Sequence, residues 1–77
     1  MSKDTDTSGQ WIDFYVKKGR YLEELSENHF MNKEYKKCLE LLSQSYSMFE
    51  KGGAESEAQR VKERFSHIKA THFGKKE

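Results

Sequence analysis

The sequence predicts an all-α fold of three antiparallel helices, in which a helix-turn-helix pair is followed by a third packing helix. Apolar residues recur every three or four positions in three separate segments, which is helical periodicity. Short polar connections separate the segments, and connections of a few residues force neighbouring helices to run antiparallel. The chain has no proline and no long alternation of apolar and polar residues, so strands are not expected.

The first helical segment follows a polar stretch without apolar side chains over residues 2–8. We therefore expect a disordered tail over residues 1–8 and a three-helix domain over residues 9–72. Thr7 and Gln10 have capping-box spacing, which predicts the helix start there. Gly19 lies inside the pattern and costs about 1 kcal/mol relative to alanine, so it either weakens the helix or splits it. The periodic positions are Trp11, Phe14, Tyr15, Lys18, Leu22, Leu25 and His29.

The second segment has the clearest periodicity and is predicted to be the central helix. Residues 31–33 form a tight connection before it, with Asn32 as the expected N-cap. Two adjacent apolar stripes indicate that this helix packs against two neighbours. The main stripe contains Tyr35, Cys38, Leu39, Leu42, Tyr46 and Phe49, and the flanking stripe contains Leu41, Ser45 and Met48.

The third segment starts after Lys51-Gly52-Gly53, where a cation and two glycines are typical of a helix C-terminus. We expect the helix to begin at Ala54 or at Ser56, and residues 73–77 to form a frayed tail. Its apolar stripe is narrow and consists of Ala58, Val61, Phe65, Ile68 and His72.

Composition limits the function. Hydrophobic residues make up 34% and charged residues 35% of the 77 residues, against about 45–50% and 25% in ordinary globular chains. A thin helical assembly fits these values better than a core that houses a substrate pocket. The net charge of +1 gives no overall field that would attract nucleic acid or an anionic membrane. One cysteine, a polar N-terminus and no long apolar run predict a soluble, cytoplasmic protein.

No motif predicts catalysis, so we expect no enzyme activity, no cofactor and no metal. His67 and His72 are five residues apart, which places them on different faces of a helix. Cys38 lies within an apolar stripe, where a buried cysteine behaves as a small hydrophobic residue. Glu63 and His67 are spaced as an ordinary surface pair.

The hairpin resembles a tetratricopeptide repeat, a unit of two antiparallel helices with a set pattern of large and small residues. The similarity covers Gly19 to Phe49, and Lys33 stands where the family has a turn glycine. The third helix would then be the first helix of a following repeat. A microtubule-interacting-and-transport-type three-helix module is similar as well. The matching positions are Leu22, Leu25, Ser26, Tyr35, Cys38, Leu42 and Ser45.

Both resemblances imply a non-enzymatic adaptor or regulator that binds a partner protein or peptide through a groove or apolar face. In the repeat, charge reversal by Glu23→Lys would leave the fold intact and change partner affinity. The implied groove residues are Arg20, Glu23, Glu27, Phe30 and Met31 of the first helix, and Gln59, Glu63 and His67 of the third.

Two questions remain open from the sequence. Trp11, Phe14, Tyr21 and Phe30 either close the core or form an apolar patch for another protein or a second copy. The competing function is a small nucleic-acid-binding or secretion/assembly accessory protein that uses a basic C-terminal helix. Its cations are Lys62, Arg64, Lys69, Lys75 and Lys76, interleaved with glutamates.

Overall fold

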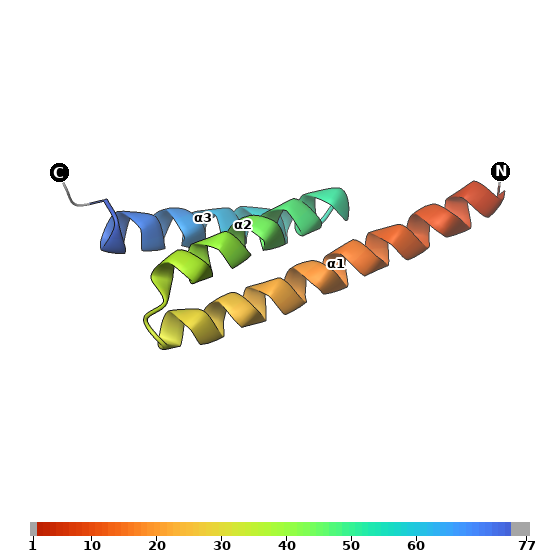
Figure 1. Ribbon diagram of the computed structural model, residues 1–77. Coiled ribbons are helices and arrows are strands. Elements are labelled where there is room, and N and C mark those ends of the chain that lie inside the picture. The colour runs from red at the N-terminus through yellow and green to blue at the C-terminus, as the bar shows by residue number, and fades with distance from the viewer. Residues whose placement is uncertain (1, 75–77) are drawn as a thin grey trace.

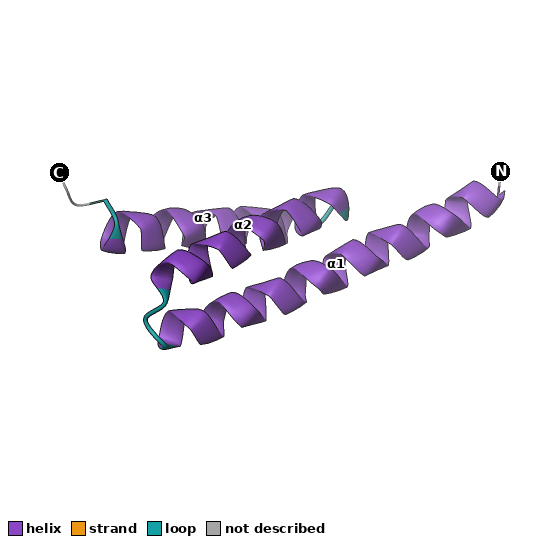
Figure 2. Ribbon diagram, viewed as in Figure 1, coloured by secondary structure: helices purple, strands orange, loops and turns teal. Residues whose placement is uncertain are grey.

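A computed structural model describes the backbone of residues 2–74 and the side chains of residues 11–74. Three α-helices follow one another: α1 (Ser2–Met31), α2 (Tyr35–Lys51) and α3 (Glu55–His72) (Figures 1 and 2). The described residues contain no strand. The predicted all-α fold is therefore confirmed.

The helix boundaries differ from those predicted at several points. α1 begins at Ser2, earlier than the capping-box spacing of Thr7 predicts, and it runs through Gly19 without interruption. Met1 and residues 75–77, which include most of the predicted frayed tail, lie outside the described residues. The division into a tail and a domain at residue 9 stays a prediction.

The two connections share one backbone design, the Schellman motif, in which the residue after the helix adopts a left-handed conformation. After α1 this residue is Lys33 (φ 66°), and after α2 it is Gly53 (φ 72°). The amides of Glu34 and Ala54 donate to the carbonyls of His29 and Phe49, five residues back. Backbone hydrogen bonds therefore close both turns. The prediction that Asn32 is the N-cap of α2 is wrong: Glu34 occupies that position, and its side chain makes no capping hydrogen bond.

The core forms along α2, which packs against both α1 and α3. The predicted role of the second segment as central helix is thus confirmed. Five of its residues, Cys38, Leu41, Leu42, Ser45 and Phe49, are buried because α2 lies against both other helices. The buried residues are Leu22, Ser26, Cys38, Leu41, Leu42, Ser45, Phe49, Ala58, Val61 and Ile68.

α1 and α2 approach most closely at Gly19. A β-carbon at this position would lie 2.8 Å from Cδ1 of Phe49, whose ring is fully buried. The hydroxyl of Ser45 donates to the Gly19 carbonyl over 2.7 Å. Gly19 therefore does not split the helix; it makes room for the Phe49 ring.

An aromatic cluster joins the three helices where the C-terminal ends of α1 and α3 meet the start of α2. The rings of Tyr35 and His72 stack at 3.8 Å between centroids, and Phe30 packs edge-on against both. Arg64 lies over the Phe30 ring at 5.3 Å. Phe30, one of the predicted groove residues, thus helps to hold the helices together.

The other end of the molecule is open. Figure 1 shows α1 projecting beyond the turn between α2 and α3, so its N-terminal part has no helix beside it. The molecule is correspondingly elongated, with extents of 54 × 21 × 14 Å. This geometry leaves large apolar side chains near the start of α1 exposed.

Candidate functional site

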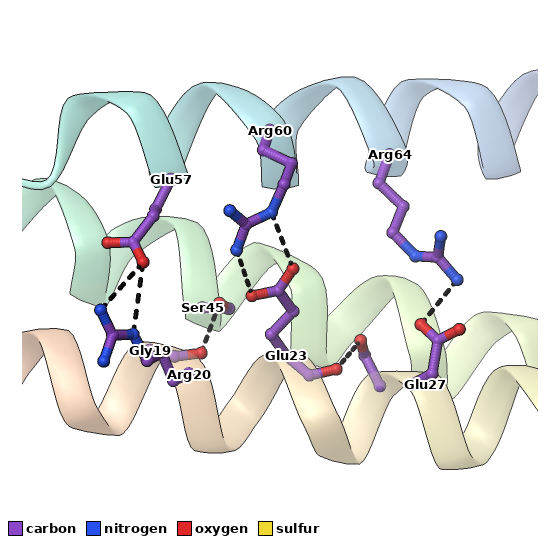
Figure 3. Close-up of polar contacts among 9 residues, drawn as sticks. Gly19, Arg20, Glu23, Glu27, Ser45, Glu57, Arg60 and Arg64 are labelled. Carbon is purple, nitrogen blue, oxygen red and sulfur yellow. Dashed lines mark hydrogen bonds and ion pairs between the residues drawn. The ribbon is translucent and has the colours of Figure 1, made fainter.

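Three ion pairs, here called the charge ladder, connect α1 to α3 across the face opposite α2 (Figure 3). Arg60 binds Glu23 with two bonds, Nη2–Oε1 at 2.8 Å and Nε–Oε2 at 3.2 Å. The pairs Arg20–Glu57 and Arg64–Glu27 have Nη2–oxygen distances of 3.3 Å and 2.7 Å. Each pair spans 37 residues, because α1 and α3 run in the same direction with a constant offset.

The charge ladder is partly shielded from water. The side chains of Glu23 and Glu57 are only 23% and 24% exposed, whereas the arginines opposite them are more than half exposed. The hydrogen bonds that Arg60 donates to the Glu23 carboxylate raise the pKa of Arg60 above its usual value. Bidentate pairs of arginine with carboxylate are geometrically specific, so the ladder sets the register of α3 along α1.

The structure brings three of the predicted groove residues together. Arg20, Glu23 and Glu27 line a depression of about 320 Å³ between α1 and α3, together with Glu24 and Arg60. Their charges, however, are paired with α3.

The other predicted groove residues lie outside the ladder. Met31 is 73% exposed at the end of α1. Glu63 accepts a hydrogen bond from Gln59 over 3.3 Å, and His67 is exposed. The face of α1 that was expected to line a groove is thus connected to α3 by ion pairs and is not an empty channel.

Sequence reasoning missed the α3 half of the ladder, namely Glu57, Arg60 and Arg64. A signal was present: these residues repeat the spacing of Arg20, Glu23 and Glu27 with every charge inverted. Such a signal becomes useful only when the helices are known to be parallel and offset by 37 residues. Helical periodicity alone does not supply that offset.

The ladder changes the expected result of Glu23→Lys. The substitution removes the bond to Arg60 and places two cations opposite each other, so it lowers the stability of the fold as well as altering the surface. In a double-mutant cycle of Glu23→Gln and Arg60→Gln, we expect a coupling energy of about 0.3–1 kcal/mol that decreases with added salt. Urea unfolding followed by circular dichroism measures it.

The matched control is the Asp13–Lys17 pair on α1, whose side chains are 64% and 73% exposed. The same cycle there should give a smaller coupling energy, since exposed pairs are strongly screened. Equal coupling energies for the two pairs at low salt would contradict the structural role assigned to the ladder.

A cluster of exposed apolar side chains lies on α1 near the open end of the molecule. Trp11 and Phe14, here called the α1 patch, are 54% and 50% exposed and share one face of the helix, whereas Ile12, 47% exposed, lies on another face. Trp11 stacks on Tyr15 at 6.2 Å and meets Phe14 edge-on at 6.0 Å. Lys51 of α2 lies 5.7 Å from the centre of the Tyr15 ring. Trp11 and Phe14 therefore do not close the core.

Tyr21 is also exposed, at 56%, but stands apart from the α1 patch in sequence. Of the four aromatic residues whose role the sequence left open, Phe30 alone is half-buried. Trp11, Phe14 and Tyr21 are therefore exposed and do not close the core. Large exposed apolar groups that lie next to one another mark interaction surfaces more often than scattered ones do.

Cys38 and His29, whose side chains are of potentially reactive types, both have local neighbours in the structure. Cys38 is fully buried, and burial raises the pKa of its thiol, with the Glu27 charge acting in the same direction against Arg64 and Ser26. His29 is hydrogen-bonded to Glu34 across the first turn. Within residues 2–74, no group of three His, Cys, Asp or Glu side chains is placed to hold a metal ion.

Comparison with known proteins gave no relative: no family model, curated protein or solved structure matched the chain. Over residues 2–74, no helix combines the length and the hydropathy that crossing a membrane requires.

Proposed function

We propose that this chain is a small non-enzymatic protein-interaction module, an adaptor or regulator, that binds a partner protein through the apolar face of α1. The observation that carries the proposal is the α1 patch. Two large aromatic side chains, Trp11 and Phe14, are about half exposed and touch each other on one face of a helix that extends past its neighbours. Aromatic residues of this kind dominate the energy of protein interfaces.

The arrangement of α1 supports binding with little loss of conformational entropy. The C-terminal half of α1 is held by α2, by the charge ladder and by the aromatic cluster at the far end. Tyr15 links the patch to α2 through Lys51. A partner would therefore meet side chains that are already carried on a supported helix, and preorganisation of this kind favours affinity.

The arginines of α3 favour a protein partner over nucleic acid. Arg60 and Arg64, two of the cations in the basic C-terminal third, are paired with Glu23 and Glu27. A phosphate backbone would have to compete with carboxylates that already occupy these guanidinium groups. The resemblance of the hairpin to a tetratricopeptide repeat supports the same class of function.

The proposal is tested by capture of partners from cells that express the protein, with the full chain immobilised. The variant Trp11→Ser/Phe14→Ser changes two exposed side chains of the patch. The control Lys17→Ser/Glu24→Ser changes two exposed polar positions on the same helix. We expect wild type and control to retain the same partner, and the patch variant to lose at least about tenfold in affinity, ~1.4 kcal/mol.

Light scattering during size-exclusion chromatography identifies the case in which the partner is a second copy. A dimer that forms with wild type and control, and is absent with the patch variant, would make self-association the function of the patch. Equal capture by all three proteins, together with a strict monomer, would rule out the α1 patch as a binding surface.

A further inference from the structure

A second surface is hollowed along the seam between α2 and α3. Three neighbouring depressions of about 630, 790 and 320 Å³ lie along it. The first two share Lys36, Glu40 and Phe73, and the second and third share Ser43 and Phe65. They therefore form one continuous groove, here called the α2–α3 groove, whose lining on α2 runs from Tyr35 to Tyr46, about 18 Å of helix.

The floor of the α2–α3 groove is apolar and incompletely covered. Leu39, Tyr46 and Phe65 pack against the buried core but remain only half-buried. Phe73, just after α3, is 47% exposed at one end of the groove. Among the described residues, none of α1 lines these depressions, so their floor is left open on the side away from α1.

The rim of the groove carries an excess of positive charge. Lys36 on α2 and Lys62 and Lys69 on α3 line it. None of these three lysines forms an ion pair with another residue of the described chain. Of the two acids that line the groove, Glu34 is bonded to His29 and Glu40 is paired with Lys37 at 3.9 Å.

The opposite end of the seam has the opposite charge. Glu50 and Glu55 line a further depression beside Gly53 and Ala58. Glu50 also accepts a hydrogen bond from the Tyr46 hydroxyl over 2.8 Å. The charge along the seam therefore changes from positive near Phe73 to negative near the turn between α2 and α3.

We propose that the α2–α3 groove binds an acidic amphipathic helix of a partner protein. Leucine-type side chains on one face of that helix would cover Leu39, Phe65 and Phe73, and its glutamates or aspartates would meet Lys36, Lys62 and Lys69. The acidic part of the ligand lies at the Phe73 end, since Glu50 and Glu55 repel it from the other. This inference rests on the proposed function in assigning protein binding, but it uses a separate surface.

Concave shape favours a helix over the two other anionic partners. An amphipathic helix fits an apolar groove between two helices through side chains at i, i+3, i+4 and i+7. A membrane surface is flat on this scale and would contact the lysines without covering the groove floor. Nucleic acid would use the lysines but would leave Leu39 and Phe65 uncovered.

Two designed peptides of about 18 residues, ~27 Å of helix, test the proposal. Both carry the same leucine stripe; one has glutamates beside the stripe and the other has lysines. With the full chain labelled by ¹⁵N, we expect the glutamate peptide to shift the amides of residues 36–46 and 62–73. We also expect it to bind at least about tenfold more tightly than the lysine peptide at low salt, where charges are weakly screened.

Charge-reversal variants sharpen the test. Lys62→Glu/Lys69→Glu should reverse the preference between the two peptides, because both lysines are exposed. The matched control Lys17→Glu/Lys18→Glu, on α1, should leave the preference unchanged. Circular dichroism confirms that both variants stay helical. The Trp11→Ser/Phe14→Ser variant should bind the glutamate peptide normally, which separates this inference from the α1 patch.

Five outcomes would overturn the inference. These are equal affinity for the two peptides, shifts that map to α1, and an unchanged preference in Lys62→Glu/Lys69→Glu. The fourth is binding to vesicles of anionic lipid, or to a DNA duplex, in the absence of any binding to the glutamate peptide. The last is a wild-type dimer whose dissociation on dilution shifts the amides of the α2–α3 groove. In that case the groove binds a second copy of the chain and not an acidic helix.

Discussion

The Leu42→Asp variant is expected to be unfolded at room temperature. Leu42 is fully buried on α2, within the cluster that includes Phe49 and Val61. Removing a buried leucine side chain costs about 2–5 kcal/mol, and an unpaired carboxylate at the same place adds a further desolvation cost. A core of this size supplies only a few kcal/mol of net stability. Far-ultraviolet circular dichroism should show loss of most of the helical signal.

Ser43→Asp is the matched control, because it introduces the same side chain one position along the same helix at an exposed site. It should remain folded, with a stability change within about 0.5 kcal/mol of wild type. A cooperative unfolding transition in Leu42→Asp similar to that of wild type would show that Leu42 is not in the core of the protein in solution.

Gly19→Leu is the second variant with a large expected effect, and it should be destabilised by at least ~2 kcal/mol. The β-carbon alone would lie 2.8 and 2.9 Å from two carbons of the Phe49 ring. The ring is fully buried and cannot move aside. Separating the helices to relieve the clash would also break the 2.7 Å bond from Ser45 to the Gly19 carbonyl. The midpoint of urea unfolding measures the loss.

Intrinsic helix propensity alone predicts that Gly19→Leu stabilises the protein, since leucine is more favourable than glycine by about 0.8–1 kcal/mol in a helix interior. Lys18→Leu, at the neighbouring exposed position, serves as control and should leave stability nearly unchanged. The double variant Gly19→Leu/Phe49→Ala should lose less stability than the sum of the two single variants, because each change makes room for the other. Additive losses would show that the two residues are not in contact.

Much of the fold could be predicted because helical periodicity is a local property. The stripe from Cys38 to Phe49 identified α2 as the helix with two neighbours, and both neighbours are present. The glycines after Lys51 predicted the second turn, where Gly53 adopts the left-handed conformation. The first turn uses the same backbone design with Lys33, a residue type that does not indicate such a conformation.

The surfaces were predicted less well, because they depend on how distant segments align. Arg20, Glu23 and Glu27 were expected in a binding groove, and they do share one face. Their arginine and glutamate partners on α3 could not be assigned without the offset between the helices. The α2–α3 groove was missed for the same reason, since its floor and its lysines come from two helices.

The sequence by itself determined the three helices, the short turns and most of the core positions of the second and third helices, because spacing of three and four places side chains on one face of any helix. The tertiary structure alone decided what lies against each face. It placed Gly19 against the Phe49 ring, paired charged side chains of α1 with those of α3, and left Trp11, Ile12 and Phe14 exposed. The physical reason is that these features depend on the offset and the relative length of the helices, which periodicity within one segment does not encode.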